Sequence, residues 1–301
     1  MNMRTWQVGW AAVVAAMAGG RAEGKDSGPE VAPLPPGVRA VWNLESAERE
    51  RTPTRERVCL NGLWRWQPAG DGSADAEEVP AQGWGHFKVP GAWPGITDYM
   101  QKDAQSVFAH ASWQARRLRD VTVAWYQREF TLPADWSGRR IVLAAEYVNS
   151  VAGVWLDGRR IGEIRFPGGE LDLTAACRPG ATHVLSLRVA ALPLKEVLLS
   201  YADTNTAREV RARVARRGLC GDVHLLATPA GARIEDVKVE TSWRRREVTF
   251  EVELAAVPPD VGQVVEVVVS RDGQTERTFR SAAFRDADPG RRRFRGPVRV
   301  P

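Results

Sequence analysis

The stretch that decides the fold runs through residues 123–162 and reads VAWYQREFTLPADWSGRRIVLAAEYVNSVAGVWLDGRRIG. Its first part alternates between two sides of a strand, and its second is nearly all apolar, which is typical of a strand buried on both faces. Asp157-Gly158 favours a two-residue hairpin turn, because Gly accepts the positive φ that such a turn requires. The stretch therefore predicts the core of a β-sandwich, with strands at residues 123–131, 141–147, 153–156 and 159–164.

The same stretch resembles the sugar-binding jelly-roll domain that opens family 2 glycoside hydrolases, which include β-galactosidases, β-glucuronidases and β-mannosidases. Its residues 125–130, WYQREF, resemble the WYR-x-x-F strand of that domain, and residues 154–158, VWLDG, resemble its V-W-x-N-G hairpin. Other matching positions are Gly138, Ile141, Leu143, Glu146, Val148, Ser150 and Ile161-Gly162. The resemblance implies an all-β chain: a galactose-binding-like jelly-roll sandwich followed by an incomplete immunoglobulin-like β-sandwich.

Flanking segments extend the resemblance in the same order along the chain. The matching segments are LNGLWRWQ at 60–67, VPGAW at 89–93, LDLT at 171–174, HVLSLRVA at 183–190 and GLCGDVHL at 218–225. Residues 58–67 alternate as one strand, and a solvated loop or a short helix is expected at residues 207–218.

We expect four segments in the chain: a signal peptide at 1–22, a linker at 23–56, the jelly roll at 57–228 and the immunoglobulin-like sandwich at 229–301. Pro229-Ala230-Gly231 marks the last boundary, after which alternating strands are expected at 234–241, 247–254, 264–270 and 274–279. An immunoglobulin-like sandwich needs about seven strands, so the second sandwich is predicted to be incomplete.

The first 22 residues have the pattern of an export signal. A basic residue precedes an apolar run at residues 6–18, and small residues at 16–18 and 20–22 suit a signal peptidase. The run is too short to span a bilayer comfortably. We therefore expect a periplasmic or secreted protein with no membrane partner after cleavage.

Composition argues against some classes of partner. The net charge is +5, but the 42 basic residues are spread among 37 acidic ones along the chain, so no nucleic-acid partner is expected. The 12 Trp residues suit either stacking on sugars or a sandwich core, and core packing is the commoner role. A carbohydrate, a β-glycoside in the family, is the partner that the resemblance implies.

The cysteines and histidines form no pattern typical of a metal site. No pair of cysteines has metal-ligand spacing and the four histidines are scattered, so neither a metal nor a cofactor is expected. Cys59 and Cys220 are expected in neighbouring strands and are candidates for one disulfide in an exported protein. Free buried thiols, Cys177 included, are the alternative.

Catalytic residues are not expected in this chain. The resemblance implies a pair of carboxylates on a (β/α)8 barrel of about 250 residues that follows the two sandwiches. The acid/base of the family follows an Asn, and none of the five Asn residues here precedes a Glu. The sequence thus predicts the N-terminal, non-catalytic portion of a family 2 enzyme, inactive alone, with the barrel expected downstream.

Two loops are candidates for contact with a sugar, because loops on a rigid sandwich commonly carry binding residues. The candidate residues are Trp93, Asp98, Asp103, Asp203 and Asn205. The alternative is that the loop residues are only solvated and that Trp93 has a packing role. Two other functions stay open: a free-standing exported carbohydrate-binding module, and an interaction domain that has lost sugar binding and self-associates through an apolar patch.

Overall fold

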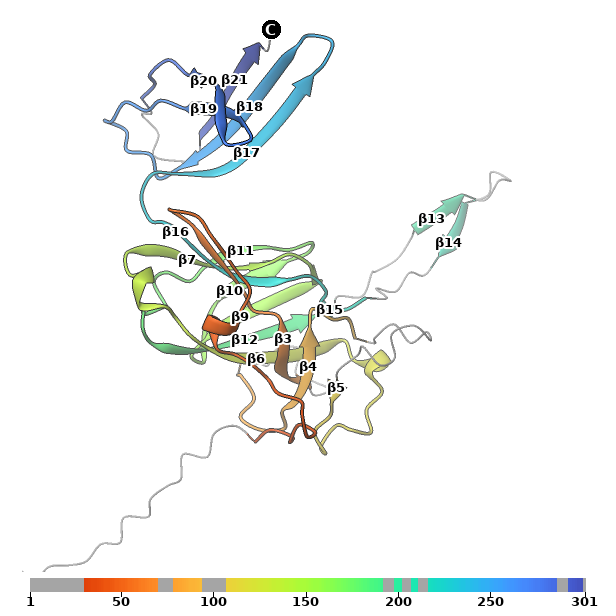
Figure 1. The fold of residues 1–301 in the computed structure, drawn as a ribbon. Coiled ribbons are helices and arrows are strands. Elements are labelled where there is room, and N and C mark those ends of the chain that lie inside the picture. The colour runs from red at the N-terminus through yellow and green to blue at the C-terminus, as the bar shows by residue number, and fades with distance from the viewer. Residues whose placement is uncertain are drawn as a thin grey trace, which may run out of the picture.

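The computed structural model describes residues 30–69, 78–93, 107–191, 198–201, 207–210, 216–285 and 292–299. Within these residues, every named strand pair is antiparallel. Figure 1 shows a large body of sheets followed by a smaller C-terminal group. The predicted all-β fold is confirmed.

Two sheets form the large body. The five-stranded sheet has the order β1-β2-β16-β7-β11. Its strands are β1 Arg49–Arg51, β2 Glu56–Cys59, β16 Val223–Pro229, β7 Arg139–Ala145 and β11 Gly169–Asp172. The seven-stranded sheet has the order β10-β9-β12-β6-β3-β4-β5. Its strands are β10 Arg159–Arg165, β9 Val151–Leu156, β12 Thr182–Ala190, β6 Val123–Thr131, β3 Gly62–Pro68, β4 Gly85–Val89 and β5 Val107–Phe108.

A single apolar cluster joins the inner faces of these two sheets. Val58 and Leu225 contribute from the five-stranded sheet, and Trp64, Trp66 and Tyr126 contribute from the seven-stranded sheet. Full burial of a large apolar side chain stabilises the folded state by about 1.5–3 kcal/mol. The expected core role of the tryptophans holds for those that are fully buried, Trp64, Trp66, Trp84, Trp93, Trp125 and Trp136.

The remaining described elements of this body are short. They are the 3-10 helices η1 Leu44–Ser46, η3 Leu118–Asp120 and η4 Ala134–Trp136, and the strands β8 Val148–Asn149 and β15 Gly218–Leu219. No helix in the described part of the chain is long and apolar enough to cross a membrane.

Three local expectations differ from the structure. The predicted single strand at 58–67 is two strands in two sheets, because Gly62 at φ +124° turns the chain between β2 and β3. The strand expected at 141–147 ends at Ala145, and Glu146 after it is exposed. Residues 207–210 form strand β14 (Ala207–Val210), paired with β13 (Leu198–Tyr201), where a loop or helix was expected.

The C-terminal group contains two small sheets. One has the order β17-β18-β21, and β19 pairs with β20. The strands are β17 Arg233–Ser242, β18 Glu247–Ala255, β19 Glu266–Arg271, β20 Gln274–Arg280 and β21 Arg292–Arg299. The first four correspond to the four predicted strands, and β21 was not predicted. The Asp272-Gly273 turn joins β19 to β20, and both residues have positive φ.

Candidate binding pocket

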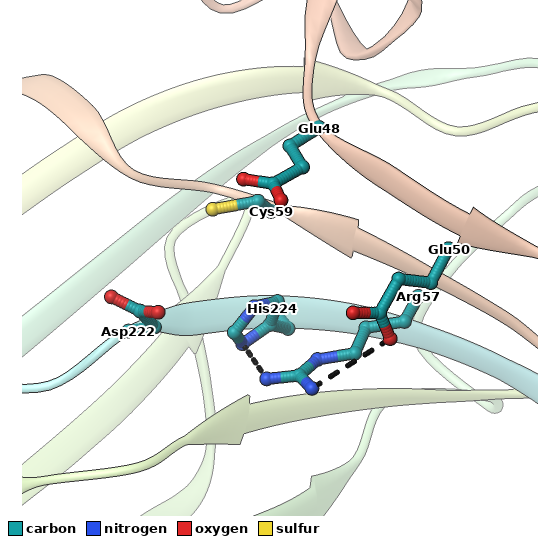
Figure 2. A pocket seen from close by; sticks show the side chains of 6 residues that line it. All are labelled: Glu48, Glu50, Arg57, Cys59, Asp222 and His224. Atoms are coloured by element: carbon teal, nitrogen blue, oxygen red, sulfur yellow. Dashed lines mark hydrogen bonds and ion pairs between the residues drawn. The ribbon is translucent and has the colours of Figure 1, made fainter.

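A polar pocket of about 190 Å³ lies on the five-stranded sheet (Figure 2). Its lining residues are Glu48, Glu50, Arg57, Cys59, Asp222 and His224. Side chains alternate between the two faces of a strand, and Val58 and Leu225 point into the core. Arg57, Cys59 and His224 therefore project from the opposite, outer face.

Strand pairing brings the lining residues together from distant parts of the chain. Cys59 on β2 is directly opposite His224 on β16. Glu50 on β1 is directly opposite Arg57 on β2. Directly opposed residues have Cβ atoms about 4.5–5.5 Å apart, which places these side chains in contact range.

Arg57 is the cation at the centre of the pocket. Its Nη2 donates to Glu146 Oε1 at 2.5 Å and to His224 Nδ1 at 3.2 Å, while Nη1 lies 3.9 Å from Glu50 Oε2. The Arg57 side chain is 37% exposed, so water weakens these ion pairs and the guanidinium has room to move.

Asn61 fixes the position of Asp222. Its Nδ2 donates to Asp222 Oδ1 at 2.8 Å, and its Oδ1 accepts from the backbone N–H of Val223 at 3.2 Å. The amide thus bridges the turn after β2 and the start of β16. The Asp222 carboxylate is therefore held in one orientation in the pocket.

Burial sets the protonation of two pocket side chains. Burial, followed by the charge of Arg57, lowers the pKa of His224, although Glu146 and Asp222 act in the opposite direction. The ring is therefore neutral at pH 7, with one nitrogen available as an acceptor or ligand. Burial also raises the pKa of Cys59, which remains a thiol.

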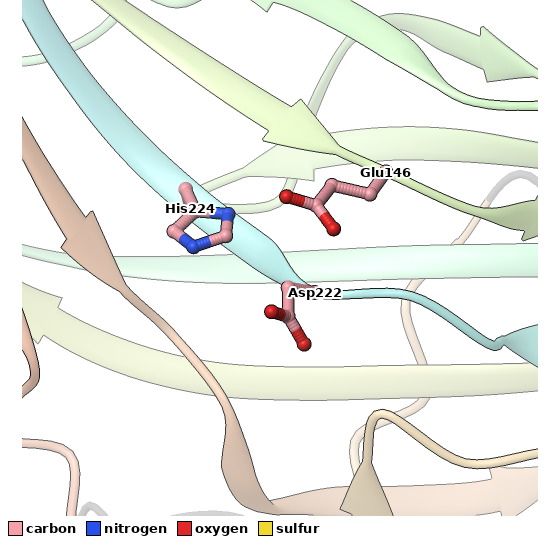
Figure 3. A group of neighbouring side chains, drawn as sticks. All are labelled: Glu146, Asp222 and His224. Atoms are coloured by element: carbon pink, nitrogen blue, oxygen red, sulfur yellow. The ribbon is translucent and has the colours of Figure 1, made fainter.

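Three groups of the kinds that bind metals meet beside this pocket. Glu146, Asp222 and His224 each bring one ligand atom within 4.8 Å of the other two (Figure 3). No metal site was expected from the sequence, so this cluster is a finding of the structure. Asp222 and His224 at i and i+2 were a readable signal, but Glu146 joins them only through the pairing of β7 with β16.

Of the five predicted sugar-contact residues, Trp93 is the one that lies among the described residues. Trp93 is fully buried, its Nε1 donates to Val121 O at 2.8 Å, and its ring packs against Trp66 and Tyr126. This is the packing role given above as the alternative. The other four candidates lie outside the described residues, so their contact with sugar stays a prediction: Asp98, Asp103, Asp203 and Asn205.

All three cysteines have free thiols in the structure. The candidate bridge between Cys59 and Cys220 is not formed there. Cys220 Sγ instead lies 3.6 Å from Gly218 O, and Cys177 is buried.

Comparisons of sequence and of structure with known proteins find similarity to β-glucuronidases. The β-glucuronidase of Felis catus is 32% identical over 159 residues, which is 52% of this chain and 22% of the cat protein. The resemblance to family 2 glycoside hydrolases is confirmed. No family model matches the chain.

Solved structures of β-glucuronidases share the fold. That of Bifidobacterium dentium, complexed with coumarin-3-O-glucuronide, has a TM-score of 0.58 at 19% identity, covering 83% of this chain and 43% of that one. That of Faecalibacterium prausnitzii has a TM-score of 0.58 at 22% identity, covering 84% and 42%. The chain thus spans about a fifth of the length of the cat relative and less than half of either solved chain.

Proposed function

We propose that this chain is the N-terminal, non-catalytic, sugar-binding portion of a family 2 glycoside hydrolase of the β-glucuronidase type. The observation that supports this best is the match to the cat β-glucuronidase, which extends over only 22% of that protein. The described part of the chain is all-β, and its fold is shared with the solved β-glucuronidases. A (β/α)8 barrel is built from eight parallel strands, whereas all named strand pairs among the described residues are antiparallel.

The absence of an Asn-Glu dipeptide from the sequence supports a non-catalytic role. A retaining glycosidase needs two carboxyl groups about 5–5.5 Å apart that act on one glycosidic bond. Of the carboxylates that line the described pocket, Asp222 accepts from Asn61 at 2.8 Å and Glu50 lies 3.9 Å from the guanidinium of Arg57.

The acidic pocket is poorly suited to a uronic acid. Glu48, Glu50 and Asp222 line it, and Arg57 is its single cationic residue. A ligand carboxylate would meet net repulsion there. This pocket is therefore not proposed as a site for a uronic acid, and the proposed sugar contacts stay with the four remaining candidates, Asp98, Asp103, Asp203 and Asn205.

Two measurements on the full chain test this function. Incubation with a fluorogenic β-D-glucuronide should release no fluorophore, and release at a rate proportional to protein concentration would overturn the non-catalytic role. Calorimetric titration with glucuronic acid, galactose and mannose should show binding to one of them. Absence of heat with all three, from folded protein, would remove the sugar-binding role.

Variants locate the binding loops. The double variants D98A/D103A and D203A/N205A are each expected to weaken binding. Asp260→Ala is the matched control, because Asp260 is an exposed residue of another turn and should leave affinity unchanged. Equal affinity in all three variants would contradict the assignment of the loops.

We also propose export of the protein through its first 22 residues. Expression of the full chain in a Gram-negative host, followed by intact-mass measurement of the periplasmic fraction, should give a chain that starts after residue 18 or residue 22. An unprocessed chain confined to the cytosol would contradict export.

A second candidate function, an interaction domain, is favoured by apolar side chains that the C-terminal sheets leave exposed. Val237 and Val239 on β17 are 46% and 53% exposed, and Trp243 beyond it is 93% exposed. Light scattering at increasing concentration separates the candidates. Self-association favours the interaction domain, and a monomer at all concentrations argues against it.

A further inference from the structure

We propose that Glu146, Asp222 and His224 form a binding site for a divalent transition-metal ion, with Zn²⁺ as the reference metal. The three side chains offer two carboxylates and one imidazole, and one ligand atom from each lies within 4.8 Å of the others (Figure 3). The site lies on the outer face of the five-stranded sheet. It is independent of the sugar loops and of the proposed function.

The backbone of two paired strands positions the three ligands. Asp222 directly precedes β16 and His224 is its second residue, so their side chains project to the same face. Ala144 on β7 is directly opposite His224, and Glu146 follows two residues later on that side. The Glu146 N–H donates to Asp222 O at 2.9 Å, which fixes the two acidic residues relative to each other.

The local charge favours a cation. Glu48, Glu50 and Asp222 line the pocket and Glu146 lies beside it, so four carboxylates face the single guanidinium of Arg57. An excess of negative charge in a concave, partly desolvated site raises the local concentration of cations. A bound divalent ion would neutralise most of this excess.

Arg57 already holds a positive charge where the ion would bind. Its Nη2 lies 2.5 Å from Glu146 Oε1 and 3.2 Å from His224 Nδ1, so it contacts two of the three proposed ligands. Glu50 lies on the other side, 3.9 Å from Nη1, and is directly opposite Arg57 in the sheet. The ion would replace Nη2, and the partly exposed guanidinium would turn towards Glu50.

The ligand set selects the class of metal. Ca²⁺ and Mg²⁺ prefer oxygen ligands alone, whereas an imidazole nitrogen with carboxylates suits Zn²⁺ and similar ions. Ligand atoms around a tetrahedral Zn²⁺ are about 3.4 Å apart, given bonds of about 2.0–2.1 Å. Glu146, whose side chain is 51% exposed, is free to close the remaining gap.

Calorimetric titration of Zn²⁺ into the untagged, chelator-treated full chain tests the proposal. One ion per chain is expected. The variants Glu146→Gln, Asp222→Asn and His224→Gln should each weaken binding at least about tenfold. Asp260→Asn is the control for Asp222→Asn and should bind as the wild type does. Metal-free circular dichroism melts of each variant show whether it is folded, and conclusions are drawn from the folded ones.

Arg57→Gln is the decisive variant, because it removes a competing cation and keeps all three ligands. It should bind Zn²⁺ more tightly than the wild type, whereas a site elsewhere on the chain would not respond. The proposal would be overturned if both Glu146→Gln and Arg57→Gln bound Zn²⁺ with the affinity of the wild type. It would also be overturned if neither the wild type nor Arg57→Gln bound Zn²⁺.

Discussion

His183 and Asp157 form a half-buried link between a hairpin turn and the strand beside it. His183 is 1% exposed, and its Nδ1 lies 2.7 Å from Asp157 Oδ2. The other ring nitrogen, Nε2, accepts from the Arg178 N–H at 3.0 Å, so the proton lies on Nδ1 and is donated to the carboxylate. Asp157 Oδ1 also accepts from the Val184 N–H at 2.7 Å. One carboxylate thus joins the β9–β10 turn to β12.

Removal of this carboxylate should destabilise the jelly roll. Asp157→Ala leaves two donors unpaired, one of them buried, and is expected to lower the free energy of unfolding by about 2–3 kcal/mol. Asp157→Asn should cost about 1 kcal/mol, because its single amide oxygen satisfies one donor only. Asn also tolerates the positive φ of this position (50°), so it separates hydrogen bonding from backbone strain. Urea unfolding measures both, and equal stability of the two variants would contradict this account.

Gly221 should not tolerate a side chain. A Cβ at this position would lie 2.7 Å from Tyr147 N and 2.8 Å from Tyr147 Cβ, and backbone cannot move aside cheaply. Gly221→Ala is therefore expected to lower the free energy of unfolding by about 1–3 kcal/mol. Gly231→Ala is the matched control, because a Cβ there meets nothing within 4 Å. Chemical denaturation compares them, and a loss of the same size in both would show that crowding at Tyr147 is not the cause.

The sequence predicted local features of the fold better than the long-range ones. The strand at 123–131 and the Asp157-Gly158 turn have the predicted positions, because alternation and positive φ are properties of neighbouring residues. The buried state of Arg128 was not predicted from its motif. Arg128 is 2% exposed, and its guanidinium donates to Leu60 O and Trp42 O, two carbonyls far away in sequence.

The metal-ligand cluster shows the same limit for the site. Asp222 and His224 were visible as neighbours on one strand, but the sequence does not show which strand lies beside them. Glu146 reaches them through the register of β7 against β16, and Arg57 through the register of β2 against β16. Both registers depend on packing between segments that are far apart in the sequence. Glu146 and Asp222, for example, are more than 70 residues apart.

His86 should make stability depend on pH below neutrality. Burial, and then the charge of Arg65, lowers the pKa of His86 below its ordinary value of 6.5. At pH values between the folded and unfolded pKa of His86, the unfolded chain binds more protons than the folded chain. As far as His86 is concerned, the free energy of unfolding therefore has its full value above pH 6.5 and decreases as the pH falls. The loss levels off below the folded pKa. His86→Gln should flatten this part of the curve of unfolding free energy against pH, measured from pH 7.5 to 5. Parallel curves for variant and wild type would contradict a role for His86.

The thiols should react slowly in the folded protein. Burial raises the pKa of Cys177 to about 12 and that of Cys220 to about 11. At pH 8 their thiolate fractions are therefore on the order of one part in ten thousand and one part in a thousand, and the thiolate is the form that iodoacetamide alkylates. Intact-mass measurement should show slow labelling of the folded chain. In guanidinium chloride without reductant, three adducts are expected, because all three thiols are free in the structure. A single adduct on the exported protein would instead show a disulfide, and peptide mapping would show whether it joins Cys59 to Cys220.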